Sequence, residues 1–344
     1  MSEPTPRNTA SGGVRPDTTR LQRLARAYCE TAVLYAALDL GLFTAVAGGA
    51  DTEPALATAL GIAPLNVERL VAACTALGLL ERDGDQLRNA PDVARFAVQG
   101  EPTYAGPWLN FTRGDVPDWF RLAEIMRRDE PPRPLGKYST LTVAEARAYH
   151  EATYSIGMGA GRRFARQVDL SRRTRLLDLG GGSGAYSIAA TAAYPGLRAV
   201  VLDLPPVVEV AREFIAANGA SERVQAVAGD FTRDPFPTDC DAVAMASNLP
   251  IYNEQTIAAV VRKAHDALLP GGEMHLVGEM LDDDRRGPLD PALWGLSEAI
   301  HGSAGKAHTV GQVCGYFRAA GFLEVAATPF VPGVLTRVSG SKAR

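Results

Sequence analysis

The 344-residue sequence has few cysteines, and no two of them are spaced as a redox or zinc motif requires. The four cysteines are far apart in the chain: Cys29, Cys74, Cys240 and Cys314. Neither a disulfide framework nor a metal site is therefore predicted. We expect these side chains to be small buried hydrophobic groups in a reducing compartment.

An excess of basic residues is also missing, because 35 Lys and Arg stand against 39 Asp and Glu, for a net charge of -4. This balance argues against a surface for nucleic acid or anionic membranes. Charge or proline interrupts every long apolar stretch, and the first twenty residues lack the apolar core of a signal peptide. We therefore expect a cytoplasmic protein. Its 46% apolar residues are enough for the cores of about two domains.

The chain divides into four segments by composition and periodicity. Residues 1–18 are rich in Pro, Thr, Ser and Gly and are predicted to be a disordered tail. Residues 19–100 follow the order helix, turn, helix and hairpin, which is typical of a winged helix. Residues 101–165 are predicted to be a helical, aromatic-rich linker that lines a substrate pocket, and residues 166–344 alternate strands with helices.

A winged helix raises the alternative of a DNA-binding regulator. The second helix of the motif, Pro64 to Leu77, has only Asn66, Glu68 and Arg69 as strongly polar residues. It lacks the cluster of Arg and Lys that neutralising phosphates requires. A dimerisation or lid module is therefore favoured over DNA binding.

The most informative motif is Asp178-Leu179-Gly180-Gly181-Gly182-Ser183-Gly184, which directly follows the apolar pair Leu176-Leu177. Glycines at a strand end let the backbone approach a ligand, and the N-terminus of the next helix attracts negative charge. A dinucleotide site uses a similar turn, so an NAD dehydrogenase is one alternative. The leading carboxylate of Asp178 favours a ligand with an ammonium group instead, which indicates S-adenosylmethionine (SAM).

Three later strands also end in polar residues. The strand Ala199 to Leu202 ends in Asp203-Leu204, where a ribose diol is normally bound, and Val224 to Ala228 ends in Gly229-Asp230-Phe231. There the Asp230 carboxylate could accept from an adenine amino group while Phe231 covers the ring. The strand Ala242 to Ala246 ends in Ser247-Asn248. Because ligands bind at the carboxyl ends of parallel strands, these ends predict one shared crevice.

Taken together, these motifs resemble the class I SAM-dependent methyltransferases of the caffeate and flavonoid O-methyltransferase type, in a bacterial version from specialised metabolism. The resemblance covers nearly everything after residue 20 and includes Leu202-Asp203-Leu204-Pro205, Leu269-Pro270-Gly271-Gly272 and Ala320-Gly321-Phe322. It implies a Rossmann-like α/β domain with a mainly parallel seven-stranded sheet, preceded by an α-helical winged-helix domain that makes a homodimer.

The resemblance also implies a set of site residues. SAM, and its product S-adenosylhomocysteine, would be bound by a set drawn from the four strand ends: Asp178, Gly180, Gly182, Gly184, Asp203, Leu204, Asp230, Phe231 and Ser247. A small, aromatic or polyketide-like substrate would be contacted by a second set: Trp119, His150, Tyr154, Met158, Asn248, Trp294 and Glu298.

The catalytic histidine of this family is missing from its usual place. The stretch Asn248-Leu249-Pro250-Ile251-Tyr252 is one residue short, and Pro250 stands where the histidine is expected. Histidine suits the deprotonation of a phenol near pH 7, so another base is predicted. The candidates for a catalytic role are His301, His308, Glu279 and Tyr252.

The substituted histidine leaves three chemistries open. The first is O-methylation with a substitute base or with a substrate acidic enough to ionise alone. The second is methylation of carbon or nitrogen, where the nucleophile needs less help. The third is a SAM-binding tailoring enzyme that transfers no methyl group.

Overall fold

The computed structural model describes residues 16–344, so the tail predicted at 1–18 lies almost entirely outside the described residues. The chain forms two compact units that divide between Gly106 and Pro107. Residues 101–106 of the predicted linker thus fall in the first unit, and its remainder belongs to the second.

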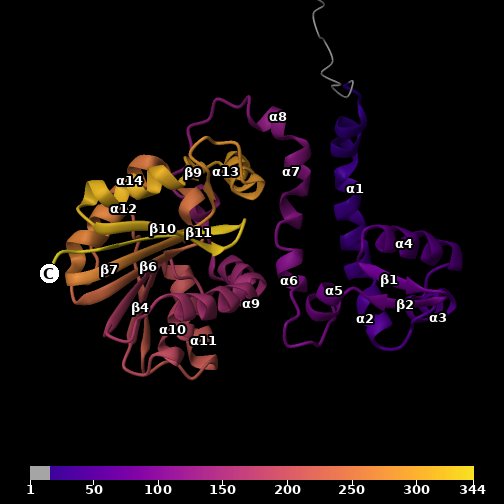
Figure 1. Ribbon diagram of the computed structural model, residues 1–344, viewed down its shortest axis with the longest axis horizontal. Helices are drawn as coiled ribbons and strands as arrows, with labels where there is room; N and C mark the ends of the chain where they lie inside the picture. Colours follow the sequence, from indigo (N-terminus) through magenta and orange to yellow (C-terminus); the bar gives the residue numbers. More distant parts are fainter. Residues whose placement is uncertain (1–15) are drawn as a thin grey trace, which may run out of the picture. The chain divides into compact units, whose positions relative to one another are not determined.

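The first unit has the order of elements predicted for a winged helix (Figure 1). A long first helix is followed by three short ones, a hairpin and a last short helix: α1 (Thr19–Asp39), α2 (Leu42–Ala47), α3 (Glu53–Leu60), α4 (Pro64–Ala76), β1 (Leu80–Asp83), β2 (Gln86–Asn89) and α5 (Pro91–Phe96). The Thr52 hydroxyl caps α3 by accepting from the Ala55 N–H at 3.4 Å. The two strands are antiparallel, and Gly84 takes φ +59° in the turn.

Among residues 16–344, no single helix is long and apolar enough to cross a membrane. Only α3 and α4 taken together pass that test, and they are bent by 113° at the break between them.

The second unit is built on a seven-stranded sheet with the order β10-β11-β7-β6-β3-β4-β5. Its strands are β3 (Arg175–Leu179), β4 (Arg198–Asp203), β5 (Val224–Ala228), β6 (Cys240–Ala246), β7 (Leu268–Gly278), β10 (Leu323–Val331) and β11 (Leu335–Ser341). All neighbouring pairs are parallel except those that β11 makes with β7 and β10. The mainly parallel seven-stranded sheet predicted from the sequence is confirmed, and β10 and β11 close it as an antiparallel hairpin.

Helices cover both faces of this sheet (Figure 1). On one face lie α12 (Glu254–Ala267) and α14 (Val310–Ala320), and on the other lie α9 (Val143–Gln167), α10 (Ala185–Ala193) and α11 (Pro205–Ala217). Alternation along β6 serves both cores, since Val243 and Met245 join the first cluster and Ala242 and Ala244 the second. The carboxyl ends of β3, β4, β5 and β6 therefore share one edge.

Shorter elements complete this unit, the first of which begins at the last residue of the first unit. Before α9 come α6 (Gly106–Leu109), η1 (Arg113–Asp115), α7 (Val116–Phe120), α8 (Leu122–Ile125) and η2 (Gly136–Thr140). After β6 come η3 (Leu249–Ile251), β8 (Met280–Leu281), α13 (Leu289–His301) and β9 (His308–Thr309). Helix α9 packs closely on α10, because a Cβ at Gly161 would come within 2.7 Å of the Ala185 carbonyl oxygen.

Two local expectations differ from the structure. The sequence Pro270-Gly271-Gly272 predicts a turn before a strand from Glu273 to Met280, but the strand begins earlier, at Leu268, because Leu268 already pairs with Cys240 across a register shift. Cys29 is only half-buried, whereas the other three cysteines are buried as expected.

Candidate active site

The glycine loop between β3 and α10 lies against side chains from three other segments. Gly180 and Gly182 take φ +62° and +57°, the left-handed region that favours glycine. A Cβ at Gly180 would collide with the Asn248 amide and come within 2.9 Å of Phe231 Cε1. A Cβ at Gly182 would come within 2.5 Å of His150 Cε1. Side chains here would thus displace the residues that surround the loop.

Asp178, at the end of β3, is buried beneath this loop with 1% of its surface exposed. Its Oδ2 accepts a 2.7 Å hydrogen bond from the Ser187 hydroxyl, but Oδ1 has no partner within residues 16–344. Burial raises the pKa of this carboxyl to about 6, against the opposing effect of the Ser187 bond. A buried carboxylate oxygen without a donor fits a ligand that brings one, such as an ammonium group.

Asp203, at the end of β4, holds the loop from the other side. Its Oδ2 accepts from the Gly182 N–H at 2.8 Å, and its Oδ1 accepts from the Leu204 N–H at 2.7 Å. Burial raises the pKa of Asp203 to about 6, although both N–H groups oppose the rise. Each oxygen keeps a further lone pair that could accept from a hydroxyl of a ribose.

The ends of β5 and β6 complete this edge. The Asp230 Oδ1 accepts from the backbone N–H and the hydroxyl of Thr232 at 2.9 and 2.6 Å. Phe231 is buried and meets the Tyr252 ring edge-on at 5.4 Å. The Asn248 Nδ2 donates to the Leu179 carbonyl at 3.2 Å, whereas its Oδ1 finds no partner in the described chain.

Ser247 is an exposed residue with φ +59°, an uncommon conformation for a non-glycine residue. It directly precedes Asn248, so the strained backbone stands next to the amide that contacts the glycine loop. The unpartnered oxygens of Asp178 and Asn248 fit a cofactor with the polar groups of SAM.

A second polar cluster surrounds His301, the last residue of α13. Its Nε2 lies 3.2 Å from Asp115 Oδ2 and 3.2 Å from Lys137 Nζ, and its Nδ1 lies 3.5 Å from Glu298 Oε1. The Glu298 Oε2 in turn accepts from the Ser303 hydroxyl at 2.5 Å. These contacts hold the imidazole, of which 8% is exposed, between two carboxylates.

The charges of this cluster favour protonation of His301. Burial lowers the pKa of the imidazole, but the hydrogen bonds to Asp115 and Glu298 outweigh burial and raise it above 6.5. The bond to His301 lowers the pKa of Asp115, and burial lowers that of Lys137. The Nε2 atom accepts from Lys137 when the ring is neutral and donates to Asp115 when it is protonated. His301 is therefore equipped to take up a proton.

Aromatic rings connect the two clusters. Tyr149 meets Phe111, Tyr138 and the neighbouring His150 ring edge-on, at centroid distances of 5.0, 5.9 and 5.0 Å. Lys137 Nζ lies 5.8 Å from the centre of the Phe111 ring. Because His150 contacts Gly182 and Lys137 contacts His301, this chain of rings runs from the glycine loop to the His301 cluster.

The electrostatics of Tyr149 agree with this placement. Burial raises the pKa of its phenol, and the carboxylates of Glu279, Asp203 and Glu298 raise it further. The pKa of this phenol is therefore raised both by Asp203, at the end of β4, and by Glu298, in the His301 cluster. Glu279 itself is half-buried between β7 and β8, and burial raises its pKa.

The sequence did not single out Asp115, Lys137 or Tyr149 as site residues. Asp115 and His301 are 186 residues apart, and the segment before α9 has no periodic pattern that predicts which side chains turn inward. The only available signal was the density of aromatic residues in 101–165, which includes Tyr149.

His308 is corrected from a candidate base to a part of the scaffold. It is fully buried, with Nε2 2.9 Å from the Tyr252 carbonyl oxygen and Nδ1 3.1 Å from the Tyr316 hydroxyl. One nitrogen donates and the other accepts, so the neutral ring has no nitrogen left for a substrate. Burial also lowers its pKa.

Tyr154 and Met158 are predicted to contact substrate, and that role stays a prediction. Both pack with the core on the α10 and α11 face of the sheet, where the Tyr154 ring stacks on Phe214 at 4.4 Å. His150 and Asn248 were also predicted to contact substrate, but both lie against the glycine loop.

The other predicted residues have fewer contacts that bear on function. Tyr252 is buried against Phe231, and burial raises the pKa of its phenol. Trp119 and Trp294 are half-buried on α7 and α13.

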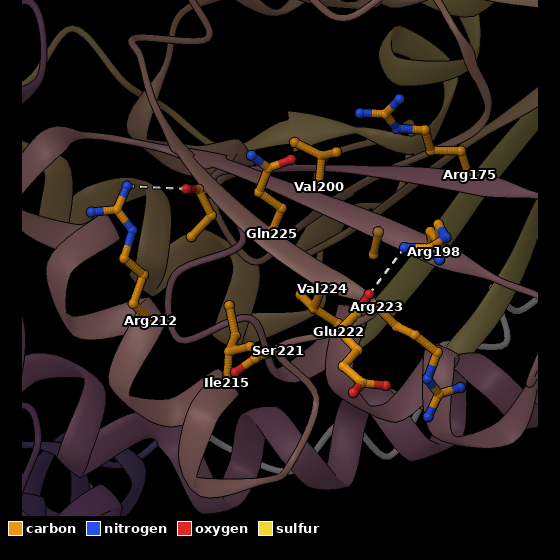
Figure 2. A pocket seen from close by; sticks show the side chains of 12 residues that line it. Arg175, Arg198, Val200, Arg212, Ile215, Ser221, Glu222, Arg223, Val224 and Gln225 are labelled. Atoms are coloured by element: carbon orange, nitrogen blue, oxygen red, sulfur yellow. Dashed lines mark hydrogen bonds between the residues drawn. The ribbon is translucent and has the colours of Figure 1, made fainter.

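A surface pocket of about 620 Å³ lies elsewhere, at the amino ends of β3, β4 and β5 (Figure 2). Arg198 donates to the Glu222 carbonyl and Arg212 to the Ala226 carbonyl, at 3.0 and 3.4 Å. These arginines therefore brace the backbone. A second cavity of about 460 Å³ includes Tyr252 and Thr232 in its lining, beside the Asp230 turn.

No cluster of three or more His, Cys, Asp or Glu side chains in residues 16–344 is arranged to hold a metal ion. The geometry instead combines strand ends whose polar groups suit SAM with a histidine placed between carboxylates.

Comparisons with known proteins agree with this geometry. The sequence model of the O-methyltransferase domain family matches residues 138–323, and that of the O-methyltransferase dimerisation domain matches residues 22–99. The chain is 35% identical over 330 residues to the 3-hydroxy-5-methyl-1-naphthoate 3-O-methyltransferase of Streptomyces sahachiroi, covering 94% of this chain and 95% of that protein.

Another relative and a solved structure extend the comparison. The chain is 31% identical over 272 residues to the N,N-dimethyltransferase OxyT of Streptomyces rimosus, covering 76% and 78% of the two chains. The structure of human N-acetylserotonin methyltransferase in complex with SAM matches its fold with a TM-score of 0.79 at 24% identity, covering 96% of this chain and 100% of that one. The chain therefore belongs to the SAM-dependent O-methyltransferase family and combines a dimerisation domain with a methyltransferase domain.

Proposed function

We propose that this enzyme methylates a phenolic oxygen of a small, planar aromatic natural product, with His301 as the general base. The observation that carries the proposal is the placement of His301 between Asp115 and Glu298, at the end of a chain of aromatic rings that begins at the glycine loop. The naphthoate substrate of the Streptomyces sahachiroi relative supports the same substrate class.

The cofactor would be held at the carboxyl edge of the sheet. Asp178 would accept from its ammonium group, Asp203 from its ribose hydroxyls and Asp230 from its adenine, with Phe231 against the ring. SAM supplies a methyl group on a positively charged sulfur. Every other requirement of the reaction, namely orientation of the acceptor and removal of its proton, falls to the protein.

Deprotonation would proceed at Nε2 of His301. A substrate hydroxyl that replaces the Lys137 ammonium at this nitrogen would give its proton to the neutral ring. The imidazolium that forms would donate to Asp115 and Glu298, while the displaced Lys137 cation stabilises the phenolate. The aromatic side chains Phe111, Tyr138 and Tyr149 would hold the flat ring of the acceptor.

Methyl transfer to nitrogen is the second candidate, because OxyT is named as an N,N-dimethyltransferase. A neutral amine already carries the lone pair that attacks and needs no base before the transfer. The same pocket would then use His301 only after the transfer, to take up the proton released.

The test is product analysis with methyl-labelled SAM and three matched acceptors: 3-hydroxy-1-naphthoate, 3-amino-1-naphthoate and 1-naphthoate. We expect a labelled methyl ether from the hydroxy compound and no product from 1-naphthoate, as identified by mass spectrometry and NMR. Label on nitrogen alone would favour the second candidate, and label on a ring carbon would contradict both.

We also propose that the active enzyme is a homodimer formed through the first unit. Helix α1 exposes Leu21, Leu24 and Tyr28, which recur at helical spacing with 56, 61 and 55% of their surfaces exposed. An apolar stripe of this kind on a dimerisation domain fits a contact with a second copy.

A further inference from the structure

His150 combines burial with the absence of any polar partner. Only 9% of its surface is exposed, and its closest ring neighbour is Tyr149, at 5.0 Å between centroids. Neither ring nitrogen has a hydrogen bond within the described part of the chain. The ring faces the glycine loop, since its Cε1 would lie 2.5 Å from a Cβ placed on Gly182.

Packing alone does not account for a histidine at this position. Burial lowers the pKa of the ring to about 4, so at neutral pH it has one N–H donor and one acceptor nitrogen. Neither ring nitrogen is among the fully buried unpartnered atoms of residues 16–344, so both reach the protein surface, where a ligand can meet them. The polarity of His150 therefore indicates a group that arrives with a ligand at the glycine loop.

The charges around the loop indicate which group this is. The methionine part of SAM has one ammonium and one carboxylate. The unpartnered Asp178 Oδ1 lies below the loop, where a Cβ at Gly181 would come within 2.7 Å of its Oδ2, and it suits the ammonium. His150 approaches the loop at Gly182, close to the N-terminus of α10, which attracts anions.

The hydrogen bonds of the two acids that flank the loop involve no cationic side chain in residues 16–344. Asp178 and Asp203, the two acids that flank the loop, bond only to Ser187, Gly182 and Leu204 in residues 16–344, and no lysine or arginine joins them. Donors that approach the loop include its backbone N–H groups, the Asn248 amide and the imidazole. We propose that His150 is a cofactor-binding residue that donates its N–H to the carboxylate of the methionine part of SAM.

This role differs from the substrate contact that the sequence predicted for His150, and it does not depend on which atom is methylated. The test is calorimetric binding of two ligands to the purified enzyme. S-adenosylhomocysteine has both the ammonium and the carboxylate, whereas S-adenosyl-3-thiopropylamine keeps the ammonium and lacks the carboxylate.

The decisive variant is His150→Phe, which keeps a ring against Tyr149 and removes the donor. We expect it to weaken S-adenosylhomocysteine about 10-fold or more and to leave the affinity for S-adenosyl-3-thiopropylamine within about 2-fold. His150→Asn, which retains an N–H donor, should recover part of the loss. Asp178→Asn should weaken both ligands, because both carry the ammonium.

Thr153→Val is the matched control on the same helix, and neither affinity should change, because the Thr153 hydroxyl already donates to the Tyr149 carbonyl of its own helix at 3.0 Å. An equal loss of both ligands in His150→Phe would show that the ring only supports the loop. Unchanged affinity for S-adenosylhomocysteine would show that the ring does not contact the cofactor. Either result overturns the proposal, and comparing two ligands within one variant removes any general effect on folding.

Discussion

Asp178→Asn should weaken cofactor binding and at the same time remove an unfavourable buried charge from the protein without cofactor. A pKa of about 6 in place of the usual 3.8 means that the ionised carboxylate destabilises the fold by about 3 kcal/mol at neutral pH, at ~1.4 kcal/mol per pKa unit. Because the folded state has the higher pKa, it binds more protons than the unfolded state between about pH 4 and 6. Wild-type stability therefore falls as pH rises through this range.

The variant has no carboxyl to titrate at this position. The free energy of unfolding of the variant minus that of wild type should therefore increase by about 2 kcal/mol from pH 4.5 to pH 7.5. Burying the asparagine amide changes the free energy of unfolding by the same amount at both pH values, so this cost does not contribute to the pH-dependent difference. All three tryptophans, Trp108, Trp119 and Trp294, lie in the second unit, so urea unfolding followed by tryptophan fluorescence reports on that unit. Loss of the ammonium partner should meanwhile weaken S-adenosylhomocysteine at least about 30-fold, or about 2 kcal/mol.

Asp241→Asn is the matched control, because this carboxylate accepts from the Thr174 and Arg175 backbone N–H groups at the amino end of β3. It should lower stability without changing cofactor affinity. A pH-independent stability difference for Asp178→Asn, or an affinity within about 3-fold of wild type, would refute the reasoning about this buried carboxylate.

Two further predictions concern the glycine loop and the dimer. Gly182→Ala should weaken S-adenosylhomocysteine about 10-fold or more in calorimetry, because the added Cβ would collide with His150, whereas Gly159→Ala on α9 meets nothing within 4 Å and should leave binding unchanged. Equal affinities in the two variants would contradict the close approach. Leu24→Glu should shift the protein from dimer to monomer in analytical ultracentrifugation, because it places a charge in the exposed apolar stripe of α1, whereas Gln22→Glu on another face of the same helix should not. A dimer that survives Leu24→Glu would place the contact elsewhere.

Much of the fold could be predicted because local signals agreed with the global arrangement. Continuous apolar runs marked β4 and β6, and an apolar pair marked β3. Thr309 is a residue type that favours an N-cap, and its hydroxyl caps α14 by accepting from the Gln312 N–H. The early start of β7 was missed because Pro270, Gly271 and Gly272 indicate a turn. The pairing of Leu268 with Cys240 depends on a neighbouring strand and not on local sequence.

The cofactor edge was easier to predict than the His301 cluster for a physical reason. Each residue of the cofactor edge follows a strand of a parallel sheet, so topology alone brings their ends together. Asp115, Lys137 and His301 meet through irregular segments, where no periodicity determines the direction of a side chain. His308 was misjudged because only the structure shows that both of its nitrogens are bonded.

The central claim, that His301 replaces the missing family histidine, is tested most directly by the pH dependence of kcat/KM for wild type and His301→Gln. The acceptor should be a phenol that ionises above pH 9, so that its own titration stays outside the range. Wild-type kcat/KM should rise with pH through an apparent pKa above 6.5 and then level, because only neutral His301 can accept a proton. His301→Gln should lose this inflection and about 10²- to 10⁴-fold in kcat/KM, with unchanged affinity for S-adenosylhomocysteine. A variant that keeps the wild-type rate and inflection would contradict the account.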